Sequence, residues 1–534
     1  MSAPVPSDPS GPERPPAPGG RAARPLVYGS ILVTGAATLA LELIASRLLT
    51  PYVGGGLIVW TAILSITLLA LATGYHLGSR WSAHDARGRF VLLPALAAVV
   101  LGLTAAFCPD LLPALTGSGA LTGAFVGAIV LLVPTLVLLS AMGPLGIALI
   151  RTGTGDAGAG EVFAVSTVGS VLGVFVAAFG LLPFMAPPAT LGVLGLSLAA
   201  VSAVGVWRLG APHGIGAIAL AGLAGAGLAG GALTGGPAAV AIGAYRFEHV
   251  ATERSPHATI VVADARRHQG EGRVRLYLQE NQMQSARGYG LPGQPMEYAA
   301  VAEALIADTV PPGGRVLVLG LAGGVVASDL AGAGYAVRAV EINPRAVAVA
   351  RRWFDLHPEV EVAIADARRH VERCRDRHDA VFIDVFNGLE TPEHLVTREF
   401  FAAVAGCLAD GGVIVVNAVV PPVDVRPTRR LVAALVAATG APVAVYEDEP
   451  GEPGRHNRVL LARPDGAPPP PTLVLPHYPS RLFDREPRRL SPQVLAPPDL
   501  AGVPPLTDWS NDFALSLALT TSAPDGIAIP AQWY

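Results

Sequence analysis

Long apolar runs that are almost free of charge fill the first 240 residues and constrain the fold more than any other feature. About 20 largely apolar residues suffice for a helix to cross a bilayer. Such runs lie at 27–49, 57–79, 90–108, 120–141, 162–183, 188–207 and 214–236. The sequence therefore predicts an α-helical multi-pass membrane domain over 26–236, with about seven helices, after a disordered tail over 1–25 that is rich in proline and glycine.

Arginines indicate how this domain is oriented. Arg80, Arg87 and Arg89 follow the second run, Arg151 follows the fourth and Arg208 the sixth. By the positive-inside rule these loops and the amino terminus lie in the cytoplasm. Seven spans would put the rest of the chain outside the cytoplasm, whereas six would put it inside. We therefore expect a multi-pass protein of the cell membrane, with the side of the globular half left open.

Composition excludes several classes of chemistry. All 37 basic residues are arginine, which rules out Schiff-base and P-loop lysines. The three cysteines are far apart and form neither a disulfide framework nor a zinc site, so we expect no metal. A net charge of -4 gives no basic excess, so we expect no nucleic-acid partner.

Beyond the apolar runs, short apolar strands alternate with helical stretches. From Arg315 the strands are RVLVLG, AVRAVEI, VEVAIA, DAVFID and GVIVVN. This alternation predicts an α/β doubly wound (Rossmann-like) domain with a parallel sheet over 300–465, within a unit that spans 243–465. A Pro-rich carboxyl-terminal extension follows over 466–534. In such sheets ligands bind beyond the carboxyl ends of the strands, so the residues that end the strands are the informative ones.

Those strand ends predict a site for an adenosyl ligand. The small-residue turn that includes Gly320, Ala322 and Gly324 lets a ligand approach the backbone where a helix starts. It is closer to the GxGxG of class I S-adenosylmethionine-dependent folds than to a dinucleotide GxGxxG. Glu341 ends the second strand, where a carboxylate can accept hydrogen bonds from ribose hydroxyls. Asp366 ends the third strand, where an acid would meet the adenine amino group.

Asp384 ends the fourth strand and faces the same crevice. An acid there can take a proton from an attacking amine or hold a cationic substrate. The structural alternative is that Asp384 caps the helix that follows.

Three groups of segments together resemble the spermidine synthases, or polyamine aminopropyltransferases, in their bacterial form fused to a membrane domain. They are GAATLALELIASRLLTPYVGGG and the residues up to 80; RSPHATIVV with RLYLQENQMQS; and IDVFNGLETPEHLVTREFF with LADGGVIVVN. The resemblance implies β-hairpins over 243–290 and a class I methyltransferase-like fold. It also implies transfer of an aminopropyl group from decarboxylated S-adenosylmethionine, a co-substrate, to putrescine or a related amine, with no prosthetic group.

The resemblance also implies roles for individual residues. Gln284 would touch the nucleoside, Glu341 would hold the ribose, and Asp366 with Ala367 would read the adenine. Asp384 would be the catalytic base, with Gly320, Ala322 and Gly324 forming the turn under the donor. Asn387 takes the place of the second acid of the family's DSSDP motif, and Tyr298 begins what is left of its Tyr-His-Glu motif; both would contact the substrate.

Departures from the family pattern leave other functions open. The aspartate that holds the donor's aminopropyl amine is replaced by Gly323, and Tyr-His-Glu reads Tyr298-Ala299-Ala300. One alternative is an S-adenosylmethionine-dependent methyltransferase acting on a hydrophobic substrate; another is a non-catalytic membrane transporter or sensor. The expected partners are a small-molecule amine, an adenosyl donor and the lipid bilayer, and a homodimer stays an open alternative. Whether Asp508 or Asp512 in the late LTDWSNDFA segment reaches the site is also open.

Overall fold

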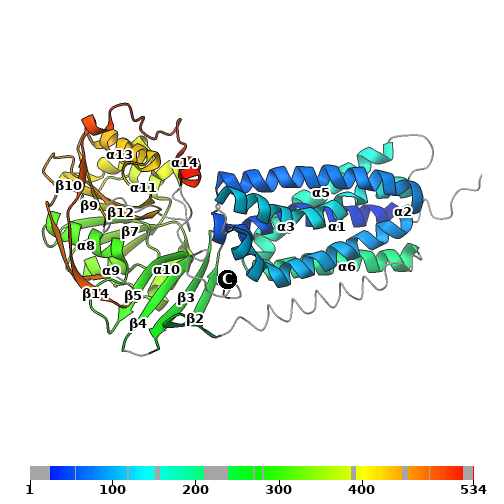
Figure 1. The fold of residues 1–534 in the computed structure, drawn as a ribbon, viewed down its shortest axis with the longest axis horizontal. Coiled ribbons are helices and arrows are strands. Elements are labelled where there is room, and N and C mark those ends of the chain that lie inside the picture. Colours follow the sequence, from blue (N-terminus) through cyan, green and yellow to red (C-terminus); the bar gives the residue numbers. More distant parts are fainter. Residues whose placement is uncertain are drawn as a thin grey trace, which may run out of the picture.

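The structure, a computed structural model, has a bundle of apolar helices and an α/β domain lying side by side (Figure 1). It describes residues 24–54, 56–116, 120–150, 157–209, 238–255, 257–268, 271–279, 282–385, 392–447, 455–479, 482–520 and 533. The seventh predicted span, 214–236, and the predicted tail up to residue 23 lie outside the described residues.

Among the described residues, five helices are long and apolar enough to cross a membrane. The bundle consists of α1 (Arg24–Val53), α2 (Leu57–Thr116), α3 (Ala120–Ser140), α4 (Met142–Ile150), α5 (Ala157–Phe175), the π-helical turn η1 (Val176–Leu181) and α6 (Pro187–Leu209). Helices suit apolar surroundings because they satisfy their backbone polar groups internally. The six predicted spans that fall on described residues are all helical, although α1 begins two residues inside the predicted tail.

Two predicted spans, 57–79 and 90–108, form the two arms of α2. The helix is interrupted at Asp85, whose backbone is not helical (φ -132°, ψ 72°). The Asp85 carboxylate accepts a hydrogen bond from the Gly88 N–H at 2.9 Å and so caps the second arm.

Helices α1 and α5 pack backbone against backbone. A Cβ placed on Gly169 would lie 2.2 Å from the carbonyl oxygen of Leu32, and one on Gly173 would lie 2.1 Å from that of Ala36. Small residues four apart on one helix allow this close approach, which van der Waals contact stabilises within a bilayer.

The chain after the bundle forms a five-stranded antiparallel sheet in the order β1-β2-β3-β4-β5. Its strands are β1 (Ala239–Ile242), β2 (Tyr245–Arg254), β3 (Thr259–Arg267), β4 (Arg273–Gln279) and β5 (Gln282–Tyr289). Helix α8 (Glu297–Thr309) leads from this sheet into the α/β domain.

An eight-stranded sheet in the order β15-β11-β12-β10-β9-β6-β7-β8 forms the centre of the α/β domain. The parallel strands are β6 (Arg315–Leu319), β7 (Ala336–Glu341), β8 (Glu361–Ile364), β9 (His378–Ile383) and β10 (Leu408–Val420). These are the five strands that the sequence predicted. Beyond them, β12 (His456–Ala462) pairs antiparallel with β10, β11 (Val443–Tyr446) with β12, and β15 (Gln493–Leu495) with β11. Because β11 is antiparallel to β12, it runs in the same direction as β10, and helix α13 (Arg426–Thr439) connects these two strands.

Helices cover both faces of this sheet. Side chains alternate between faces along a strand, so Val316 and Val318 pack into one core and Leu317 and Leu319 into the other. The first core includes α8, α9 (Val325–Gly332) and α10 (Pro344–Trp353). The second includes α11 (Ala367–Glu372), α12 (Arg398–Ala405) and α13 (Arg426–Thr439). This three-layer arrangement leaves the carboxyl ends of the parallel strands free for a ligand.

The residues beyond 465 are not a separate extension. Strands β13 (Leu473–Pro479) and β14 (Arg485–Leu490) form a hairpin, and β15 pairs with β11 at the edge of the main sheet. The 3-10 turns η3 (Glu393–Leu395) and η4 (Pro497–Leu500) are short, and α14 (Phe513–Thr520) contacts α2 and α3 of the bundle (Figure 1). The predicted boundary at 465/466 therefore falls inside the domain, because a Pro-rich composition still permits short edge strands.

Candidate active site at the strand ends

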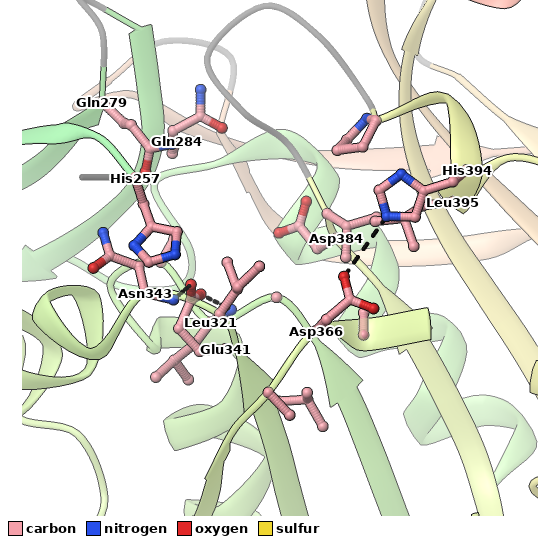
Figure 2. A pocket seen from close by; sticks show the side chains of 18 residues that line it. His257, Gln279, Gln284, Leu321, Glu341, Asn343, Asp366, Asp384, His394 and Leu395 are labelled. Atoms are coloured by element: carbon pink, nitrogen blue, oxygen red, sulfur yellow. Dashed lines mark hydrogen bonds and ion pairs between the residues drawn. The ribbon is translucent and has the colours of Figure 1, made fainter. Parts of the chain in front are cut away.

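A cavity of about 230 Å³ opens at the carboxyl ends of β6, β7, β8 and β9. The chain order reverses between β6 and β9, which is where doubly wound sheets bind their ligands. Figure 2 shows polar side chains converging on this cavity from both sides. Its described lining is His257, Gln279, Gln284, Gly320, Leu321, Ala322, Val340, Glu341, Ile342, Asn343, Ala365, Asp366, Ala367, Asp384, Val385, Pro392, His394 and Leu395.

The turn after β6 brings the ends of β6 and β9 into direct contact. Gly320 has a positive φ of 90°, and a Cβ there would lie 2.0 Å from the main-chain oxygen of Asp384. Ala322 (φ 47°) lines the cavity, and Gly324 (φ 70°) adopts the left-handed conformation immediately before α9. Glycine is therefore required at 320 by both backbone conformation and space.

Glu341 is fixed by two backbone N–H groups. Its Oε2 accepts a hydrogen bond from Leu321 N at 3.0 Å, and its Oε1 accepts one from Asn343 N at 2.8 Å (Figure 2). Each carboxylate oxygen can accept a second hydrogen bond. Glu341 can therefore still accept hydrogen bonds from the hydroxyls of a ligand in the cavity.

Asp366 lies on the opposite side of the cavity and caps α11. Its Oδ1 accepts a hydrogen bond from Arg369 N at 2.9 Å, and its Oδ2 lies 3.6 Å from Nε2 of His394 (Figure 2). Ala367 begins α11 and also lines the cavity. The helix amino terminus at this point presents backbone donors beside a carboxylate acceptor.

Asp384 is half-buried in the cavity wall, and its Oδ1 accepts a hydrogen bond from Asn417 Nδ2 at 2.9 Å. Burial raises the pKa of Asp384 to about 6, while the hydrogen bond from Asn417 and the nearby Tyr298 hydroxyl lower it in part. A carboxyl group with this pKa can exchange protons near neutral pH. The helix-cap alternative concerns the residues that follow, of which 386–391 lie outside the described part of the chain.

Tyr298 supports this wall from α8. Its hydroxyl donates a hydrogen bond to the main-chain oxygen of Gln284 at 2.8 Å. Burial and the nearby charge of Asp384 raise the pKa of Tyr298 well above its ordinary value. Tyr298 therefore stays protonated and links the strand that carries Gln284 to the Asp384 carboxylate.

The structure brings most of the predicted site residues together. The cavity includes Gln284, Gly320, Ala322, Glu341, Asp366, Ala367 and Asp384, whereas its described lining does not include Gly324 or Tyr298. Asn387 lies outside the described residues. Sequence reasoning gave no role to His257, Asn343, His394 or Asn417. Asn417 ends the apolar run GVIVVN, so the rule that singled out the other strand ends could have found it.

Neighbouring side chains fill the space beside Gly323. A Cβ at this position would lie 3.0 Å from Ser285 Oγ and 3.2 Å from Phe354 Cδ1. An aspartate would need room beyond that Cβ, so the neighbours would have to move. Ser285 and Phe354 therefore occupy space that the side chain of the family's aspartate would need at position 323.

Neither Asp508 nor Asp512 is part of the described lining of the cavity. Asp508 accepts a hydrogen bond from Arg368 of α11 at 2.7 Å. Asp512 forms ion pairs with Arg426 and Arg430 of α13. Both carboxylates hold the carboxyl-terminal segment against the helices that flank the site.

Comparisons with known proteins support the expected resemblance. The polyamine aminopropyltransferase of Vibrio vulnificus (strain CMCP6) is 38% identical over 111 residues, which are 19% of this chain and 37% of that protein. The N-terminal histidine N-methyltransferase of Emericella nidulans is 36% identical over 110 residues, 20% of each chain. No family model matches.

A probable spermidine synthase from Corynebacterium glutamicum has a solved structure that is 26% identical to this chain. The likeness covers 40% of this chain and 80% of that one, with a TM-score of 0.36. The chain thus spans just over a third of the length of the Vibrio relative, and its resemblance to polyamine aminopropyltransferases is confirmed over that part.

Proposed function

We propose that this protein is a membrane-anchored aminopropyltransferase that uses decarboxylated S-adenosylmethionine and putrescine or a related amine. The observation that carries the proposal is Asp384, a half-buried carboxylate with a pKa of about 6 in the cavity at the carboxyl ends of the parallel strands. The resemblance to the Vibrio polyamine aminopropyltransferase supports the same chemistry.

The donor would lie across the turn after β6. Glu341, held by two backbone N–H groups, would accept hydrogen bonds from the ribose hydroxyls. Asp366 and Ala367 would meet the adenine, and Gln284 would contact the nucleoside from the five-stranded sheet. We assign that sheet to the β-hairpin subdomain of the family. This placement brings the sulfonium beside Asp384.

Asp384 would act as the base. The acceptor nitrogen loses a proton to the Asp384 carboxylate and attacks the aminopropyl carbon bonded to sulfur. A carbon–nitrogen bond forms, the carbon–sulfur bond breaks, and its electron pair stays on methylthioadenosine. Positioning of the two substrates and removal of the proton supply much of the catalysis in this type of displacement. With putrescine as the acceptor, the product is spermidine.

The helical bundle would anchor the enzyme in the cell membrane. Its five long apolar helices fit a bilayer by length and composition. Contacts of α14 with α2 and α3 would hold the catalytic domain at the end of the bundle (Figure 1).

Incubation of the full chain with decarboxylated S-adenosylmethionine and putrescine tests the proposal. We expect equimolar spermidine and methylthioadenosine, and product formation at least about a hundredfold slower in the Asp384→Asn variant, which should still bind methylthioadenosine. The absence of turnover despite tight binding of the donor would contradict the proposal and favour a sensor or transporter.

The second candidate is methyl transfer from intact S-adenosylmethionine to a hydrophobic acceptor. The observation that favours it is Gly323, because the site has no aspartate there to select a donor without a carboxylate. The similarity to an N-methyltransferase is in line with this alternative. Tighter binding of S-adenosylmethionine than of its decarboxylated form, with methyl incorporation from labelled donor, would favour this second function.

A further inference from the structure

A second cavity of about 310 Å³ is lined by residues of α8, α9 and β13 and of the segments next to them. It shares no lining residue with the candidate active site. Its polar lining includes Gln294, Glu303, Asp329 and His477. The side chain of Asp329 is 41% exposed, so the cavity is accessible from solvent.

Two carboxylates in this cavity share one amide group. Gln294 Nε2 donates hydrogen bonds to Glu303 Oε1 and to Asp329 Oδ2, each at 2.5 Å. Arg287 Nη1 lies 3.4 Å from Asp329 Oδ1 and supplies one positive charge. When both carboxylates are ionised, Glu303, Asp329 and Arg287 together therefore carry one net negative charge.

The amide oxygen of Gln294 provides an independent indication of a ligand. Gln294 is 5% exposed and lines the cavity, yet its Oε1 has no hydrogen-bond partner among the described residues. A buried acceptor without a donor is unfavourable. Beside the two carboxylates of the cavity there is thus a buried amide oxygen that lacks a donor, and all three groups accept hydrogen bonds.

The remaining lining is largely apolar and would suit a short hydrocarbon chain. Leu330, Tyr335 and Leu475 contribute to it, together with Ala300 and Ala304 of α8. An ammonium group has three donors and one positive charge, which match the acceptors and the uncompensated charge. We infer that this cavity binds the primary ammonium group of a small aliphatic amine at a site separate from the reaction centre.

The electrostatics of the cavity agree with this inference. Burial and the neighbouring Asp329 charge raise the pKa of Glu303 well above its ordinary value. A bound ammonium would stabilise the ionised form of Glu303 and would replace the proton that the carboxyl group otherwise retains.

Titration calorimetry of the full chain in detergent micelles with butylammonium chloride tests the inference, with 1-butanol as the uncharged probe. All samples carry Asp384→Asn to remove the acid of the reaction site. We expect one butylammonium per chain and no binding of butanol. Addition of Glu303→Gln with Asp329→Asn should weaken butylammonium binding at least about tenfold, because a buried cation loses its charged acceptors. The matched control is Asp308→Asn, which removes an exposed acid from the same helix and should change nothing.

A second variant, Ala300→Leu, fills the cavity and leaves every charge in place, so it decides the question if the double variant fails to fold. The affinity of this variant for butylammonium should also fall. Unchanged affinity in Ala300→Leu or in a folded double variant would overturn the inference, as would equal binding of butanol or no binding of butylammonium. Because turnover is measured separately on the wild-type chain, loss of this site and failure of the proposed function are distinguishable.

Discussion

The side-chain amide of Asn417 donates a hydrogen bond to Asp384 Oδ1 at 2.9 Å, between the adjacent parallel strands β9 and β10. The contact fixes one carboxylate oxygen of Asp384. It also stabilises the ionised form, because a hydrogen bond to a carboxylate lowers its pKa. Asn417 thus offsets part of the effect of burial on Asp384.

The pH dependence of turnover should report Asp384 directly. Its pKa of about 6 lies above the ordinary value, so the base is protonated and inactive in acid. We expect kcat/KM for aminopropyl transfer to rise with pH through about 6 and then level off. Asp384→Asn should lower kcat by roughly 10²–10⁴-fold, the usual contribution of a general base. A wild-type profile that is flat between pH 5 and 7 would contradict this role.

Removal of the Asn417 amide should shift that profile. In Asn417→Ala the carboxylate of Asp384 loses a hydrogen bond, so its pKa should rise and the acidic limb of kcat/KM should move to higher pH. Asn457→Ala is the matched control, because Asn457 is exposed on β12 and its substitution should leave the limb in place. A fall in rate without any movement of the limb would argue against a positioning role for Asn417.

Substitution of Gly320 should disrupt the site at its centre. In Gly320→Ala the new Cβ meets the Asp384 main-chain oxygen, and the backbone must keep a positive φ. Conformational strain and overpacking together should cost about 2–5 kcal/mol in the free energy of unfolding. Gly332→Ala provides the control, because no atom lies within 4 Å of its added Cβ. Thermal unfolding of both variants checks the difference, and equal melting temperatures would refute it.

Donor selectivity should respond to the residue at position 323. Gly323→Asp alone crowds Ser285, so we pair it with Ser285→Gly to make room for the carboxylate. The paired variant should prefer decarboxylated S-adenosylmethionine over the intact donor by at least about tenfold more than the wild type, because the new acid attracts the amine and repels the carboxylate. Direct titration with both donors measures the ratio, and Ser285→Gly alone serves as the control.

Two arginines that contact the same carboxylate should differ in their effect on stability. Arg430 is 4% exposed and pairs with Asp512, and it also donates hydrogen bonds to the main-chain oxygens of Pro504 and Ser510. Arg430→Leu should therefore cost about 3–5 kcal/mol in the free energy of unfolding. Arg426 is 68% exposed, so Arg426→Ala should cost less than about 1 kcal/mol. Denaturant titration of the two variants should rank them in that order.

The sequence predicted the acids of the site because parallel strands end at one edge of their sheet. Glu341, Asp366 and Asp384 each end such a strand, so their meeting in one cavity follows from chain order. The antiparallel edge strands could not be predicted in the same way, because an apolar run does not reveal the direction of a strand. The second cavity could not be predicted from the sequence either. Gln294, Glu303 and Asp329 follow no regular spacing along the chain, and they come together only through tertiary packing.

Strand β15 seals the edge of the main sheet by pairing Val443 with Leu495 and Val445 with Gln493. Without it, β11 would present an unpaired row of backbone donors and acceptors, which is a template for association with other chains. We therefore expect β15 to protect the α/β domain from aggregation. A shortened protein that ends after residue 465 should form insoluble assemblies through β11, even though every predicted catalytic side chain precedes that point.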